Sequence, residues 1–349
     1  MVACHRPDPR NQTDRIAFVP NRANNVSDSQ GPAEISSQPG ESLKPRSTAE
    51  DWRSLYPFAS HELRIDGWRY HYLDEGQGEV LLLVHGNPTW SFYWRELVRR
   101  WRERYRVIAV DHIGCGLSDK PQVYPYCLAQ HADNLAMLVR RLDLRAITLV
   151  AHDWGGPIGL GAALADPHRF ARFTLLNTAA FRSRRMPLRI RLCRTPLLGP
   201  LAVRGLNAFA RAALSMAVAH HERMTPPVRA GLLAPYDSWQ HRVAIQSFVD
   251  DIPIDPSHPS YETLLAIEQG LPSLADRPWQ FIWGMRDWCF TPAFLQQFSE
   301  FFPQARIDRL DDAGHYVVED AYERIGPLVE EFVLAHPLPP IRNDQPSVE

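Results

Sequence analysis

Short apolar runs alternate with longer amphipathic segments through most of the chain. The runs have the length of buried strands, and the segments between them repeat apolar residues at helical spacing. Parallel strands need a crossover between them, so this alternation predicts a mostly parallel sheet with helices on both faces. The predicted strands cover residues 80–84, 107–110, 147–151, 173–176, 280–283 and 306–310, and the predicted helices cover 92–101, 128–142, 157–165, 293–302 and 322–334.

A β-hairpin is expected before this alternation, because Asp66-Gly67 suits a two-residue turn between the segments 61–65 and 68–73. Further along, the alternation stops and helical sequence interrupted by prolines takes over. We therefore expect an α/β domain in two pieces with an inserted helical cap. The pieces are 51–180 and 273–338, and the cap is 181–272.

The two ends of the chain are polar. Residues 1–50 are dense in Pro, Ser, Asn, Gln and Gly and have no periodic pattern, which predicts a disordered extension, and 339–349 read as a polar tail. The whole chain has 349 residues, of which 45% are hydrophobic, and this is enough apolar material for a large core. A net charge of −2 gives no electrostatic footprint for nucleic acid.

The sequence also predicts a cytoplasmic protein. No apolar run reaches the ~20 residues that a membrane-spanning helix needs, and the first ten residues lead into no apolar stretch typical of a secretory signal. The five cysteines are widely spaced, with no pair close enough for a CxxC motif or a zinc site, so a reducing compartment is expected.

One segment of the predicted cap is strongly basic. Between residues 182 and 221 there are eight arginines and no acidic residue. A solvated arginine face paired with acids elsewhere would explain this composition. A basic amphipathic surface that contacts lipid or another subunit, as in a homo-oligomer, is the alternative.

The segment 149–156 carries the strongest chemical signal. An apolar strand there leads through His152-Asp153-Trp154 into Gly155-Gly156. Small residues around one reactive side chain are typical of the nucleophile elbow, a tight turn between a strand and a helix. Asp153 holds the reactive position; a helix N-cap is the alternative role for an aspartate at this place.

An aspartate nucleophile points to attack on a saturated carbon. Serine would form a stable ether with an alkyl group, whereas a carboxylate forms an ester that water can later cleave. The substrate is therefore expected to be an alkyl compound.

The second step needs a base and an orienting acid. His315 follows the last predicted strand and Asp287 follows the one before it, in the chain order nucleophile, acid, histidine. Asp311 and Asp312 are rival acids, but they lie very near His315 in sequence and suit a turn better.

Two side chains could hold the leaving group. Asn87 follows a central strand and Trp154 follows the nucleophile, and both carry N–H donors that suit a halide ion. An Asx turn for Asn87 and core packing for Trp154 are the alternatives.

Four motifs together resemble the haloalkane dehalogenases of the α/β-hydrolase superfamily. They are His-Gly-Asn-Pro-Thr-Trp at 85–90, the stretch from Asp111 to Asp119, His-Asp-Trp-Gly-Gly at 152–156 and Gly-His-Tyr at 314–316. The resemblance covers residues 51–338 and implies an α/β-hydrolase fold with a cap.

The resemblance also assigns roles. It makes Asp153 the nucleophile, His315 the base and Asp287 the acid, with Asn87 and Trp154 holding halide through their side chains and forming an oxyanion hole through their backbone N–H groups. Asn177 stands where another branch of the family has a glutamate acid, which favours Asp287. The cap residue Phe248 would line the pocket wall.

The implied reaction turns a small halogenated alkane and water into alcohol, halide and a proton, with no metal and no organic cofactor. An epoxide hydrolase is the main alternative, because that class shares the Asp nucleophile and adds cap tyrosines, for which Tyr236 and Tyr261 are available. A non-catalytic binding protein on the same fold is a third hypothesis.

Overall fold

The computed structural model describes residues 51–338, so the predictions for 1–50 and 339–349 lie outside the described residues. Eight strands form one sheet in the order β1-β2-β4-β3-β5-β6-β7-β8. The pairs β1·β2 and β2·β4 are antiparallel, and the other pairs are parallel. The strands are β1 (His61–Ile65), β2 (Trp68–Glu75), β3 (Val80–Val84), β4 (Arg106–Val110), β5 (Ile147–Asp153), β6 (Phe170–Thr178), β7 (Trp279–Gly284) and β8 (Arg306–Leu310).

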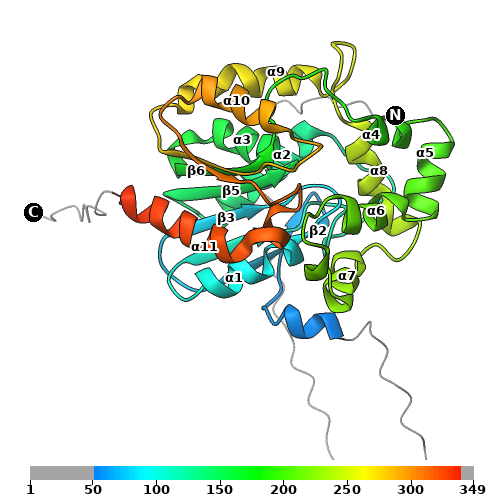
Figure 1. Ribbon diagram of the computed structural model, residues 1–349, viewed down its shortest axis with the longest axis horizontal. Helices are drawn as coiled ribbons and strands as arrows, with labels where there is room; N and C mark the ends of the chain where they lie inside the picture. Colours follow the sequence, from blue (N-terminus) through cyan, green and yellow to red (C-terminus); the bar gives the residue numbers. More distant parts are fainter. Residues whose placement is uncertain (1–50, 339–349) are drawn as a thin grey trace, which may run out of the picture. The chain divides into compact units, whose positions relative to one another are not determined.

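Helices cover both faces of this sheet, as Figure 1 shows. Every residue of β3 and β5 is buried, which is the pattern of strands covered on two sides. One face carries α2 (Leu128–Arg141), α3 (Gly155–Ala165), α9 (Tyr261–Gly270) and α10 (Pro292–Phe301), and the other carries α1 (Arg95–Trp101) and α11 (Val317–Ala335). The predicted α/β architecture is confirmed.

The cap consists of short helices at one end of the sheet (Figure 1). They are α4 (Leu188–Cys193), α5 (Leu198–Pro200), the π-helix η4 (Leu201–Gly205), α6 (Ala208–Met216), α7 (Pro226–Leu233) and α8 (Val243–Asp250). Helix α9 falls within the inserted segment 181–272, yet it packs on α3 with the core. The remaining 3₁₀ turns are η1 (Asp51–Leu55), η2 (Ser91–Trp94), η3 (Pro167–Arg169), η5 (His221–Arg223), η6 (Gln240–Arg242) and η7 (Leu271–Leu274).

The element boundaries differ from the predictions mainly where polar residues end a buried strand. Strand β5 runs on to Asp153 and β6 runs on to Thr178, because both pair with neighbouring strands up to these residues. The last helix starts at Val317 rather than at residue 322, with a non-helical turn at Ala321. These extensions bring polar side chains to the carboxyl edge of the parallel strands.

Candidate active site

Asp153 lies at the sharp turn between β5 and α3. Its φ of 53° is in the left-handed region, which costs a non-glycine residue energy and is common at functional turns. A Cβ on Gly155 would collide with the carbonyl of Val84, and one on Gly156 would collide with the Thr178 side chain. The two glycines are therefore needed for the close approach of this turn to the neighbouring strands.

Two backbone N–H groups hold the Asp153 carboxylate. The backbone N–H of Asn87 donates to Oδ1 at 2.6 Å, and the backbone N–H of Trp154 also bonds the carboxylate. The other oxygen, Oδ2, lies 3.8 Å from Nε2 of His315. This arrangement directs Oδ2 toward the histidine and provides backbone N–H donors for an oxyanion.

His315 and Asp287 form the second part of the site. Nδ1 of His315 lies 2.9 Å from Oδ2 of Asp287, and both side chains are buried. A carboxylate on Nδ1 fixes the ring so that Nε2 faces Asp153 and can take a proton. The structure thus brings together the three residues that the sequence suggested.

Asp287 accepts three further hydrogen bonds. The backbone N–H groups of Cys289 and Phe290 donate to Oδ1 at 2.6 and 3.1 Å, and the Asn177 amide donates to Oδ2 at 2.9 Å. Asn177 also accepts from the N–H of Gly284 at 2.8 Å. The sequence interpretation excluded Asn177 as the acid but missed that it holds the acid in place. Its signal was a polar residue at the end of an apolar strand.

The two rival acids do not reach His315. Asp312 forms ion pairs with Arg324 at 2.8 Å and His220 at 3.4 Å, and Asp311 is exposed at the turn after β8. Neither side chain is therefore placed to orient the His315 ring.

Burial and charge set the protonation of the two reacting groups. Burial raises the pKa of Asp153 above its usual value, although His315 and the two backbone N–H groups oppose this. Burial lowers the pKa of His315, but the neighbouring Asp287 and Asp153 carboxylates outweigh it and the pKa is raised. A charged histidine is therefore stabilised beside the carboxylates.

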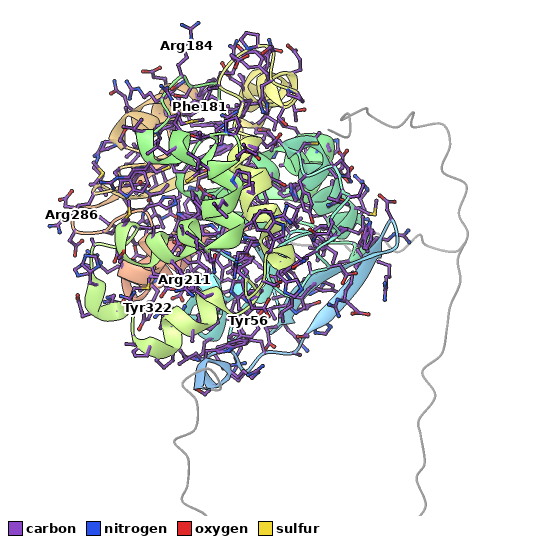
Figure 2. All side chains as sticks on the ribbon, turned by 90° about the vertical axis from the view of Figure 1, so that its right-hand side faces the viewer. Tyr56, Phe181, Arg184, Arg211, Arg286 and Tyr322 are labelled. Carbon is purple, nitrogen blue, oxygen red and sulfur yellow. The ribbon has the colours of Figure 1, made fainter. Side chains whose placement is uncertain are left out.

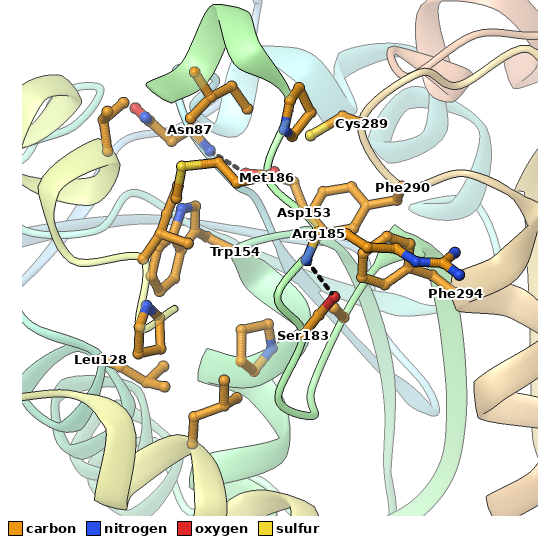
Figure 3. Close-up of a pocket in the computed structure, with 18 of the residues that line it drawn as sticks. Asn87, Leu128, Asp153, Trp154, Ser183, Arg185, Met186, Cys289, Phe290 and Phe294 are labelled. Atoms are coloured by element: carbon orange, nitrogen blue, oxygen red, sulfur yellow. Dashed lines mark hydrogen bonds between the residues drawn. The ribbon is translucent and has the colours of Figure 1, made fainter. Parts of the chain in front are cut away.

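Asn87 and Trp154 flank the nucleophile. The Asn87 amide spends one of its two N–H donors on the carbonyl of Ile245 at 3.2 Å, so the second is left for a ligand. Trp154 is half-buried beside Asp153 and lies opposite Phe290 in the pocket (Figure 3). Both line the same cavity as Asp153.

Two apolar cavities meet at Asp153. Both are lined by Asn87, Asp153, Ile190, Phe209 and Cys289. We call one cavity the Trp154 arm and the other the His315 arm, because Trp154 lines only the first and His315 only the second. With their open mouths included, the Trp154 arm has a volume of about 890 Å³ and the His315 arm about 1090 Å³. Apolar side chains line most of both arms, which suits hydrocarbon chains.

Each arm has its own walls. The Trp154 arm is bounded by core and cap residues that include Leu128, Pro157, Phe181, Val249, Leu264 and Phe294 (Figure 3). The His315 arm is bounded mainly by α6 and its neighbours, with Ala208, Ala212, Ala213, Met216, Trp288 and Tyr316. The two arms thus extend from Asp153 between different sets of side chains.

The chain is similar to known proteins over most of its length. The alpha/beta hydrolase fold family matches residues 79–196. A cis-3-alkyl-4-alkyloxetan-2-one decarboxylase from Shewanella oneidensis is 41% identical over 286 residues, which is 80% of this chain and 90% of that protein. Haloalkane dehalogenase 2 from Mycobacterium tuberculosis is 31% identical over 285 residues, which is 80% of this chain and 96% of that protein. The chain belongs to the haloalkane dehalogenase-like α/β hydrolases.

A solved structure supports the same family. Haloalkane dehalogenase DatA from Agrobacterium tumefaciens superposes on this α/β hydrolase with a TM-score of 0.72 at 25% identity, covering 80% of this chain and 97% of that one. The chain is therefore an enzyme of the α/β-hydrolase superfamily, and the hypothesis of a non-catalytic binding protein is set aside.

Phe248 has a different place in this α/β hydrolase from the pocket wall that the resemblance implied. Its ring stacks on the His131 ring, with 4.6 Å between the ring centroids, and its centroid lies 5.3 Å from that of Trp154. Phe248 lines neither arm. The face of α8 that carries it turns toward the buried histidines. Val249 is the α8 residue that reaches the cavity.

The tyrosines considered for an epoxide hydrolase also lie outside the two arms of this α/β hydrolase. Tyr236 donates to the carbonyl of Thr89, and the Tyr261 hydroxyl lies 3.4 Å from Arg182. Within residues 51–338 no group of three or more His, Cys, Asp or Glu side chains could hold a metal ion, and no helix could cross a membrane.

Proposed function

We propose that Asp153 attacks a saturated carbon of an apolar substrate and that the substrate is an oxetan-2-one with alkyl chains on two adjacent ring carbons. One observation carries this choice of substrate: two apolar arms meet at the nucleophile. The 41% identity to cis-3-alkyl-4-alkyloxetan-2-one decarboxylases supports it. A substrate with one chain would need only one arm.

The proposed first step is displacement at ring carbon 4. Oδ2 of Asp153 forms a bond to this carbon, the bond from carbon 4 to the ring oxygen breaks, and the ring opens to a carboxylate attached to carbon 3. The free N–H donor of Asn87 and the indole N–H of Trp154 would bind this carboxylate. The product is an ester between Asp153 and the substrate.

The proposed second step is loss of carbon dioxide. The bond between carbon 3 and the carboxylate breaks, its electrons form a double bond to carbon 4, and Asp153 leaves as a carboxylate. Atoms and charge balance: one oxetanone gives one alkene and one carbon dioxide, and no water is consumed. An alkyl chain in the His315 arm also excludes the water that His315 would otherwise activate.

Haloalkane hydrolysis is the second candidate. The donors Asn87 and Trp154 suit a halide, and haloalkane dehalogenases are 31% identical to this chain. Here Asp153 would displace halide, and His315 would take a proton from water that cleaves the ester to alcohol. The reactants are then a small halogenated alkane and water, and the products are an alcohol, halide and a proton.

One experiment tests both reactions. The enzyme is given cis-3,4-dihexyloxetan-2-one or 1-bromohexane, and alkene, carbon dioxide and halide are measured. We expect alkene and carbon dioxide from the oxetanone, and Asp153→Asn should abolish turnover of either substrate. Halide release without any decarboxylation would select the second candidate. Undiminished turnover by Asp153→Asn would refute the nucleophile.

His315→Gln separates the two chemistries further. Ester hydrolysis needs the base, so this variant should release halide once per site and keep a covalent alkyl group, detected by mass spectrometry. Elimination needs no water, so oxetanone decarboxylation should continue over many turnovers. A stable adduct formed from the oxetanone would contradict the proposed second step.

A further inference from the structure

The cap presents an unusual number of leucines to solvent. Of the ten large apolar side chains that are exposed among the described residues, six lie between residues 188 and 206. Their exposed fractions run from 56% to 87%. They are Leu188, Leu192, Leu197, Leu198, Leu201 and Leu206. We call residues 182–211 the cap surface; helices of this segment face the viewer in Figure 2.

The cap surface is also basic. It holds eight arginines and no acidic residue. Within it only Arg182 forms an ion pair with a described carboxylate, that of Glu268 at 2.8 Å. Arg184, which projects outward in Figure 2, Arg191 and Arg211 are exposed without such a partner. Among the described residues, a direct ion pair with an acid thus neutralises Arg182, and Arg194 lies within electrostatic range of Asp250 and Asp251.

This combination favours a lipid surface over a second copy of the chain. Two copies of the cap surface would place eight arginines against eight, and this repulsion opposes a symmetric dimer. Exposed leucines among unpaired arginines match the interface of a bilayer with anionic headgroups, where apolar side chains enter the acyl boundary and cations remain among phosphates.

The cap surface is continuous with the mouths of the cavity. Arg185 and Met186 line the Trp154 arm, whereas Arg189 and Leu192 line the His315 arm. Residues that would lie against the bilayer thus also border both arms. An apolar ligand could pass from the bilayer into either arm without crossing water.

We propose that the cap surface binds peripherally to bilayers that contain anionic phospholipid. The leucines enter the interface, and the arginines pair with phosphate groups. The protein binds to one leaflet and does not span the membrane. This proposal concerns a surface and does not depend on which reaction Asp153 catalyses.

Vesicle sedimentation of the full chain tests the proposal. The vesicles are phosphatidylcholine alone, or phosphatidylcholine with an equal part of phosphatidylglycerol. We expect binding to the anionic vesicles, weaker binding as salt is added, and little binding to the neutral ones. Leu197→Asp with Leu198→Asp should weaken binding about tenfold or more. Arg184→Glu with Arg191→Glu should weaken it at least about fivefold for each arginine.

Matched controls come from outside the cap. Leu334 is 70% exposed on α11, and the side chain of Arg145 is 71% exposed in a loop. Leu334→Asp and Arg145→Glu should change vesicle binding less than twofold. The unfolding temperature of each variant checks that it is folded. This temperature should change little, because every side chain changed here is exposed.

Three results would overturn the proposal. The first is no binding of the wild-type chain to anionic vesicles. The second is equal loss of binding in the cap and control variants. The third is that the cap variants change self-association, measured by sedimentation velocity, but leave vesicle binding unchanged. This result would identify a second copy of the chain as the partner of the cap surface.

Discussion

Burial and charge act on the His315 imidazole in opposite directions. Burial disfavours the charged ring, while Asp287 at 2.9 Å and Asp153 at 3.8 Å favour it, and the raised pKa shows that the carboxylates prevail. The ring is therefore charged over a wider pH range than a free histidine. As a base for ester hydrolysis it must be neutral, so hydrolysis should increase as pH rises through this pKa.

Asp287→Asn tests whether the Asp287 carboxylate raises the pKa of His315. Without this carboxylate, burial becomes the larger effect, so the pKa of His315 should fall below its usual 6.5. Nuclear magnetic resonance of the His315 ring, assigned by its loss in His315→Gln, measures this pKa. Asp312→Asn is the control, because Asp312 pairs with Arg324 and not with His315. An unchanged pKa in Asp287→Asn would contradict the assignment.

The same shift links stability to pH. A pKa raised in the folded state means that protonation of His315 stabilises the fold below the unfolded pKa, and this contribution is lost as pH rises through the folded pKa. Asp287→Asn should therefore destabilise the protein more at acidic pH than at alkaline pH. Urea unfolding at the two pH values measures the difference.

At the scale of elements, α6 forms a wall of the His315 arm. It contributes Ala208, Phe209, Ala212, Ala213 and Met216. Small alanines on this face leave the space that the second alkyl chain of the proposed substrate would fill. The other chain would lie in the Trp154 arm, between core helices and α8.

Ala213→Phe should narrow the His315 arm. We expect the KM for cis-3,4-dihexyloxetan-2-one to rise about tenfold or more, because an added ring overpacks the space for one chain. The KM for 1-bromohexane should change less than twofold, since its single chain fits the Trp154 arm. Ala202→Phe is the control, as Ala202 is half-buried in η4 and lines neither arm. Equal effects on both substrates would show that the arms do not hold separate chains.

At the scale of the whole molecule, one buried ion pair joins distant parts of the core. Arg95 on α1 donates to both carboxylate oxygens of Glu319 on α11, at 2.5 and 2.8 Å. Each side chain is at most 4% exposed. The last helix follows His315 closely in sequence, so this pair also fixes the segment that carries the base.

Glu319→Gln should destabilise the fold by about 3–5 kcal/mol, because it leaves the Arg95 charge buried without its partner. The control is Glu330→Gln, which breaks the ion pair with Arg100 between the same two helices. The Arg100 side chain is 44% exposed, so this change should cost only about 0–1 kcal/mol. Urea unfolding measures both values, and equal losses would contradict the role of burial.

The sequence was most informative where one signal is local. Alternating strands and helices follow from apolar periodicity, and the turn at Asp153 follows from small residues beside one reactive side chain. A local pattern was not enough to identify Asp287 as the acid. Chain order and a family resemblance selected it over Asp311 and Asp312. All three lie near the ends of strands, and sequence distance alone does not give the direction of a side chain.

Contacts between distant segments were decided only by the tertiary structure. The support of Asp287 by Asn177 spans 110 residues, and Phe248 faces the buried histidines instead of the cavity because of how α8 is rotated on the core. The meeting of two arms at Asp153 likewise depends on how the cap helices pack. The chemistry of each residue is a local property that the sequence determines. The shape of a cavity depends on how side chains from distant segments pack together, so only the tertiary structure decides it.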